Sequence, residues 1–191
     1  HSQCSDSEGE IGVERESFHT GLRAALRQDP DVVMVGEMRD AETIDTAMKA
    51  AETGHLVLST LHTPDAHTTI TRILAMFPPE EQGITRVRLA ESLHAVVSQR
   101  LLPRADGKGR IVAAEIMIAT PLVRDLIMHE QHTSELRDVI ARGRGQYGMQ
   151  TFDQHLADLV GQGAVTYEVA HAAASRPSDF ALTVRTFSET R

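Results

Sequence analysis

The clearest pattern in the sequence is a short apolar run, a helical stripe and a second apolar run. Val32–Val35 is rich in β-branched residues, and Leu56–Leu61 is a similar run, as expected for buried strands. Between them, residues 41–51 carry apolar side chains at helical spacing. Asp40 is placed to cap this helix and Gly54 to end it. The order predicts a βαβ unit with parallel strands and a right-handed crossover.

An ionisable residue follows each predicted strand. Glu37 comes two residues after Val35, and His62 comes directly after Leu61. Because ligands bind at the carboxyl ends of strands in open α/β sheets, the pattern predicts an acid and an imidazole facing one crevice. Two structural explanations stay open. Glu37 could be a capping or ion-paired acid beside Arg39, and His62 could be a structural histidine.

Helix and strand patterns continue along the chain. We expect helices over Ser17–Arg27 and after the capping residue Asp65. Further helices are predicted at Glu80–His94, Leu122–His129, Glu135–Ala141, Thr151–Gly161 and Tyr167–Ala174. Val96–Leu102 and Ile111–Ile118 flank a glycine-rich turn and predict a β-hairpin. From the βαβ spacing we also expect residues to about Leu102 to form part of the parallel sheet. Residues 1–12 and the segment after Pro177 show no such pattern, and we expect them to be irregular.

Composition narrows the class of protein. Hydrophobic residues make up 41% of the 191, which is enough for a real core. The formal net charge of -8 argues against a nucleic-acid binder that depends on phosphate contacts. Cys4 is the single cysteine, so the chain has no internal disulfide and no cysteine-based metal site. No apolar run approaches the roughly 20 residues of a membrane span.

Several segments carry a resemblance to a known family. Gly36–Asp40 (GEMRD) resembles the Walker B box of the secretion ATPase superfamily, and Gly54–Thr63 (GHLVLSTLHT) resembles its His box. Within that superfamily the chain is similar to the type IV pilus retraction ATPases of the PilT type. Thr120–Ile127 resembles their retraction motif, with Leu122, Val123 and Asp125 at substituted positions, and Tyr147–Asp153 matches the next landmark.

The resemblance implies a fold and a domain order. We expect an α/β fold with a parallel sheet, being part of a RecA-like P-loop NTPase core, followed by a C-terminal helical domain. The expected parts are residues 1–118 for the core, 119–180 for the helical domain and 181–191 for a tail. The family's P-loop, G-x-x-x-x-G-K-[ST], does not occur in this sequence. We therefore expect the second half of a longer motor, which alone neither binds ATP tightly nor hydrolyses it.

The resemblance also implies roles for individual residues. Glu37 would be the catalytic carboxylate that activates the attacking water, and His62 would sense the γ-phosphate. Thr60 and Arg39 would bind the cofactor, which is ATP with Mg²⁺ in the complete protein, and this chain would supply no direct metal ligand. The retraction motif, expected to contact a partner, comprises Leu122, Val123, Arg124, Asp125, Leu126 and Ile127. On a helix we expect only Arg124 and Asp125 of these to be exposed.

Four arginines are candidate cations at a subunit interface: Arg72, Arg86, Arg88 and Arg100. For Arg86 and Arg88, an ordinary solvated helix face is the simpler explanation.

The partners follow from the same resemblance. The complete protein would be a homohexamer at the cytoplasmic face of the inner membrane, peripheral to it, acting on the pilus platform protein and a paralogous pilus ATPase, with no nucleic acid. The alternative is a non-catalytic interaction module that binds such a ring or its platform protein. An unrelated α/β hydrolase is disfavoured because no serine or cysteine lies in a nucleophile-elbow pattern.

Overall fold

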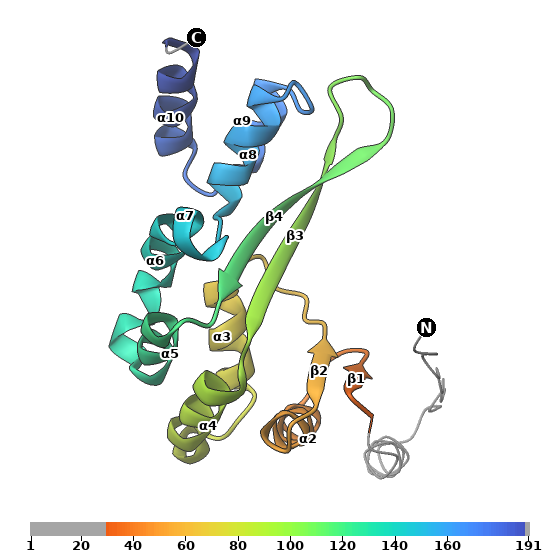
Figure 1. Ribbon diagram of the computed structural model, residues 1–191, viewed down its shortest axis with the longest axis vertical. Coiled ribbons are helices and arrows are strands. Elements are labelled where there is room, and N and C mark those ends of the chain that lie inside the picture. Colours follow the sequence, from red (N-terminus) through yellow and green to blue (C-terminus); the bar gives the residue numbers. More distant parts are fainter. Residues whose placement is uncertain (1–29, 190–191) are drawn as a thin grey trace. The chain divides into compact units, whose positions relative to one another are not determined.

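The computed structural model describes residues 30–189, and these form two compact units, the first ending at Leu61 and the second beginning at His62 (Figure 1). The predicted helix Ser17–Arg27 and the segment 1–12 lie outside the described residues. The domain boundary expected at residue 118 stays a prediction.

The first unit is the predicted βαβ arrangement. Strand β1 (Val32–Val35) pairs in parallel with β2 (Leu56–Ser59), with Val32 opposite Leu56 and Val35 opposite Ser59. The crossover is helix α2 (Ala41–Glu52), where the Asp40 carboxylate accepts the Thr43 amide at 2.8 Å. The buried side chains of β1 pack on Ala47 of this helix. The α/β fold and the parallel pairing are therefore confirmed.

Strand β2 ends two residues earlier than predicted. The sequence favoured Leu56–Leu61, but regular pairing stops at Ser59, opposite the last residue of β1. Beyond that point the Gly36 carbonyl accepts the Thr60 hydroxyl at 2.6 Å, and the Thr60 carbonyl accepts the Met38 amide at 3.1 Å. Apolar patterning could not indicate where the regular pairing stops.

The second unit begins with two helices and a long hairpin. Helix α3 (Ala66–Ala75) is capped by Asp65, as predicted, and α4 (Pro79–Ser92) follows. Strands β3 (Ala95–Pro103) and β4 (Arg110–Ile118) form the predicted antiparallel hairpin. They pair with each other in a sheet separate from that of β1 and β2, although we expected the parallel sheet to reach about Leu102.

Helices make up the rest of this unit and lie along one side of the hairpin (Figure 1). They are α5 (Pro121–Met128), the 3-10 helix η1 (Glu130–Glu135), α6 (Leu136–Arg142), α7 (Arg144–Tyr147), α8 (Phe152–Gly161), α9 (Tyr167–Ala173) and α10 (Pro177–Glu189). Leu102 and Ala113 of the hairpin share a core with Phe152, Leu156 and Phe180.

The prediction that the segment after Pro177 is irregular was wrong. Residues 177–189 form α10, and Phe180 is buried in the shared core, where its ring stacks on Tyr167 at 6.1 Å between centroids. Pro177 begins this helix, and proline is well tolerated in the first turn, where its missing N–H has no partner in any case.

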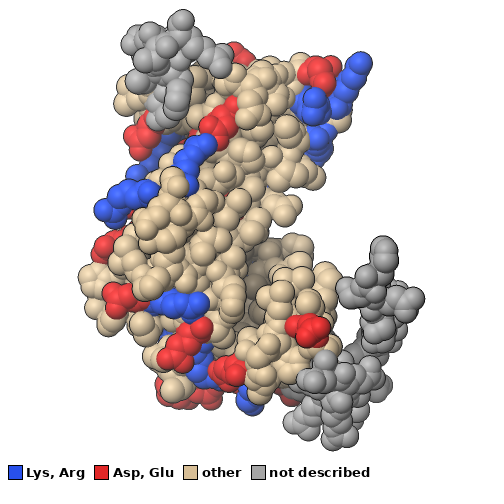
Figure 2. All heavy atoms as spheres, in the orientation of Figure 1, with Lys and Arg blue, Asp and Glu red and all other residues tan. Residues whose placement is uncertain are grey.

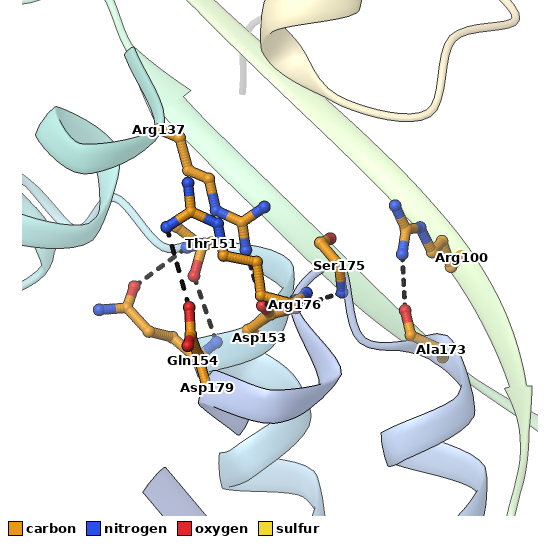
Figure 3. Close-up of polar contacts among 9 residues, drawn as sticks. All are labelled: Arg100, Arg137, Thr151, Asp153, Gln154, Ala173, Ser175, Arg176 and Asp179. Carbon is orange, nitrogen blue, oxygen red and sulfur yellow. Dashed lines mark hydrogen bonds and ion pairs between the residues drawn. The ribbon is translucent and has the colours of Figure 1, made fainter. Parts of the chain in front are cut away.

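Polar contacts fix the start of α10 (Figure 3). The Asp153 carboxylate accepts the Arg137 guanidinium at 2.6 Å and the backbone amides of Ser175 and Arg176 at 2.7 and 3.0 Å. We call these four residues the Asp153 clasp. Because its members come from α6, α8 and the junction before α10, the clasp joins three helical segments through one side chain.

The surface gives a mixed electrostatic picture. On the face shown in Figure 2, acidic and basic side chains are interspersed, with uncharged stretches between them. None of the helices described between residues 30 and 189 is long and apolar enough to cross a lipid bilayer.

Candidate functional site

Glu37 lies at the carboxyl end of β1, as predicted. Val33 and Val35 of this strand are buried. The chain leaves the strand at Gly36, so Glu37 lies just beyond its carboxyl end. One carboxylate oxygen of Glu37 accepts both the Nε and a terminal nitrogen of Arg39 at 2.7 Å. The Glu37 side chain is 26% exposed and that of Arg39 is 78% exposed. The acid is therefore ion-paired and still accessible.

Thr60 ties the end of β2 to the backbone around Glu37. Its hydroxyl donates to the Gly36 carbonyl at 2.6 Å, and its own carbonyl accepts the Met38 amide at 3.1 Å. The residues on either side of Glu37, Gly36 and Met38, are thus both hydrogen-bonded to Thr60. Thr60 and Arg39, which the resemblance predicts to bind the nucleotide, both lie beside Glu37.

His62 is the first residue of the second unit, and residues of α3 make hydrogen bonds to it and to its neighbour Thr63. A terminal nitrogen of Arg72 donates to the His62 carbonyl at 3.0 Å. The Thr63 hydroxyl bonds to the hydroxyl of Thr69 at 2.7 Å. Arg72, which the sequence offered as an interface cation, therefore acts on the backbone of the candidate sensor.

The predicted retraction motif lies on α5 and is mostly core. Val123, Leu126 and Ile127 are buried, while Asp125 is exposed, as expected. Two details differ. Leu122 is 53% exposed, and Arg124 is half-buried, because its guanidinium donates to the carbonyls of Ala90 and Glu91 at the end of α4.

Two other arginines have partners that the sequence did not indicate. Arg86 is buried, with its guanidinium on the Ile127 carbonyl at 3.0 Å and the Thr133 hydroxyl at 3.2 Å. The expected solvated face was wrong for this residue. Arg100 donates to the Ala173 carbonyl at 2.7 Å and lies 4.0 Å above the Phe152 ring. Both arginines thus bind within their own unit.

The sequence did not single out Glu115, a buried acid in β4. It accepts the Ala66 amide at 3.0 Å, and burial raises the pKa of its carboxyl, an effect that the Ala66 hydrogen bond opposes. Beside it lies a cavity of about 200 Å³ whose polar lining includes Asp65, His67 and Arg137. The presence of a charged residue inside the apolar run Ile111–Ile118 could have identified Glu115 as a candidate for a buried acid.

Carboxylates occupy the N-termini of helices α2 and α3. Phosphate sites use free backbone N–H groups at a helix N-terminus. Here Asp40 occupies the N-terminus of α2, and Asp65 and Glu115 occupy that of α3. In the described part of the chain, no group of three or more histidine, cysteine or acidic side chains is arranged to hold a metal ion.

Comparisons with known proteins place these features in a family. The model of the type II/IV secretion system protein family matches residues 9–175. The chain is 46% identical over 178 residues to the type IV pilus retraction ATPase PilT of Pseudomonas aeruginosa, covering 93% of this chain and 51% of that protein. It is 43% identical over 189 residues to the type IV pilus ATPase PilU of the same organism, covering 99% of this chain and 49% of that protein.

A solved structure agrees with this result. The pilus retraction motor PilT, crystallised with bound ADP, matches with a TM-score of 0.74 and 45% identity over 88% of this chain and 47% of that chain. The chain thus spans about half the length of the relatives it matches. The family match and the shared fold identify this chain as a member of the type II/IV secretion system protein family, of the PilT-type secretion ATPase superfamily.

Proposed function

We propose that this chain is part of a hexameric motor ATPase that powers type IV pilus retraction, and so twitching motility, by ATP hydrolysis. The observation that carries the proposal is Glu37, an accessible carboxylate fixed at the end of a parallel strand by Arg39 and Thr60. The names of the relatives, PilT and PilU, support a pilus motor.

Glu37 would act on the attacking water. Its carboxylate accepts a proton from the water as the water oxygen bonds to the γ-phosphorus and the bond to the bridging oxygen of ADP breaks. His62 would detect the γ-phosphate before hydrolysis and its loss afterwards. Mg²⁺, when bound with ATP, neutralises phosphate charge and would reach this chain through water.

This chain by itself would be inactive. Two of its helix N-termini carry carboxylates, which repel a triphosphate, and the sequence contains no P-loop lysine. In the complete protein, the P-loop would supply the backbone N–H groups and the lysine that bind ATP. The proposal therefore assigns the acid and the sensor to this chain and the phosphate cradle to the remainder.

The proposed partners are the inner-membrane pilus platform protein and a paralogous pilus ATPase, with the motor bound peripherally at the cytoplasmic face. On α5, Leu122 and Asp125 are the exposed motif residues available to a partner. The buried residues Val123, Leu126 and Ile127 would set the position of that surface.

The test is Glu37→Gln in the complete protein. The amide keeps the size of the side chain and cannot take up a proton, so we expect ATP binding to persist and turnover to fall by about 100-fold or more. Steady-state ATPase assays and nucleotide titrations measure the two properties separately. The matched control is Glu52→Gln, since Glu52 is an exposed acid at the C-terminal end of α2. Unchanged turnover would refute the catalytic role of Glu37.

A further inference from the structure

The segment from His62 to Asp65 is held by α3 through a set of hydrogen bonds. Arg72 donates to the His62 carbonyl at 3.0 Å, and the Thr63 and Thr69 hydroxyl oxygens are 2.7 Å apart. Thr69 also donates to the Asp65 carbonyl at 2.8 Å. A hydroxyl carries one hydrogen, so Thr69 must be the acceptor and Thr63 the donor in the pair. We call the Arg72 and Thr69 contacts the α3 tethers.

Helix α3 is itself firmly seated, so the tethers lead to a rigid support. Ala66, Ile70, Ile73 and Leu74 are buried. The first turn is closed by the Asp65 carboxylate, which accepts the Thr68 amide at 2.7 Å. It is also anchored to the hairpin, because buried Glu115 of β4 accepts the Ala66 amide at 3.0 Å.

Arg72 is suited to its contact by the geometry of the helix. Side chains on an α-helix point back toward its N-terminus, so a long side chain in the second turn can reach the residues that precede the first. The two tethers act at neighbouring positions, Arg72 on the carbonyl of His62 and Thr69 on the side chain of Thr63. Together they restrict the backbone from which the His62 imidazole extends.

We propose that Arg72 is a positioning residue for His62, acting from α3, whose first turn Glu115 anchors to β4. The inference rests on the proposed function, in which His62 senses the γ-phosphate. A sensor must meet its ligand in a fixed geometry, and a misplacement of about 1 Å can reduce a rate about 100-fold. By this route the hairpin and α3 would set the orientation of a residue in the nucleotide site.

The direct test uses the chain as it stands. Backbone ¹⁵N relaxation reports order on the fast timescale, with order parameters of about 0.85 for rigid residues and below about 0.6 for flexible ones. We expect Arg72→Ala to lower the values at His62 and Thr63 toward the flexible range, and Arg72→Lys to restore them in part. Thr63→Val, which removes the other tether without changing charge, should lower the same values.

Arg142→Ala is the matched control, because Arg142 is an exposed arginine that donates to the Asp138 carbonyl of its own helix. It should leave His62 and Thr63 unchanged. Unchanged order parameters at these two residues in Arg72→Ala would overturn the proposal, whatever Thr63→Val does.

Kinetics of the complete protein separate this proposal from the proposed function. Arg72→Ala should lower kcat about tenfold or more with little change in KM, and Arg72→Lys should recover part of the loss. If His62 becomes mobile and kcat does not change, the sensor role of His62 is refuted while the tether stands. If kcat falls and His62 stays ordered, positioning by Arg72 is refuted.

Discussion

Removal of the Asp153 carboxylate should release the junction before α10. The carboxylate accepts the Arg137 guanidinium at 2.6 Å and two backbone amides, from Ser175 and Arg176. The Asp153 side chain is 15% exposed and that of Arg137 is 29% exposed, so solvent screens this pair less than an ordinary surface pair. Asp153→Ala therefore leaves a largely buried cation and two amide donors without their partner.

The magnitude follows from the accessibility of each donor. A hydrogen bond to a charged group contributes about 1.5–3 kcal/mol, and a neutral one about 0.5–1.5 kcal/mol. Water can replace the carboxylate at the amides of the exposed residues Ser175 and Arg176. The contributions of these two hydrogen bonds therefore lie at the lower end of the range for bonds to a charged group. We expect Asp153→Ala to reduce the free energy of unfolding by about 2–4 kcal/mol. Asp153→Asn should cost less, since its oxygen still accepts one amide.

Urea unfolding followed by circular dichroism gives these free energies. The matched control is Asp158→Ala, because Asp158 also lies on α8 and pairs with an arginine, Arg144, with both side chains more exposed. That pair should contribute at most about 1 kcal/mol. If the two alanine variants lose the same small amount, within about 0.5 kcal/mol, the clasp does not hold α10 and the reasoning is refuted.

Three further changes test other parts of the structure. Burial raises the pKa of Glu115 above its ordinary 4.5, so its contribution to stability is present below pH 4.5 and lost as pH rises through the raised pKa. Urea midpoints over a pH series should show that the stability of Glu115→Gln relative to the wild type rises above pH 4.5. A difference in stability that does not depend on pH would contradict this. Phe180→Ala should cost about 3–5 kcal/mol in the same assay, because the ring is fully buried. Calorimetric titration of this chain with Mg-ATP should give no saturable binding tighter than about 10 μM, and such binding would reveal a missed phosphate site.

Much of the first unit could be predicted from sequence because its determinants are local. Strand β1, helix α2 and its capping residue Asp40 follow from apolar spacing and from a side chain that bonds three residues along the chain. The placement of Glu37 at a strand end required only that Gly36 close the strand. Arg39, two residues away, was likewise a partner that could be named in advance.

The sequence by itself thus determined the βαβ unit, the hairpin, the caps Asp40 and Asp65 and the family, through patterns that span a few residues. Tertiary structure decided which polar groups are buried and with what. Arg86 is bound to Ile127 and Glu115 to Ala66, partners 41 and 49 positions away. A charged residue on a helix or strand looks solvated until the distant chain that desolvates and bonds it is in place. Local patterns carry no information on that distant partner, so only the folded chain placed these two residues.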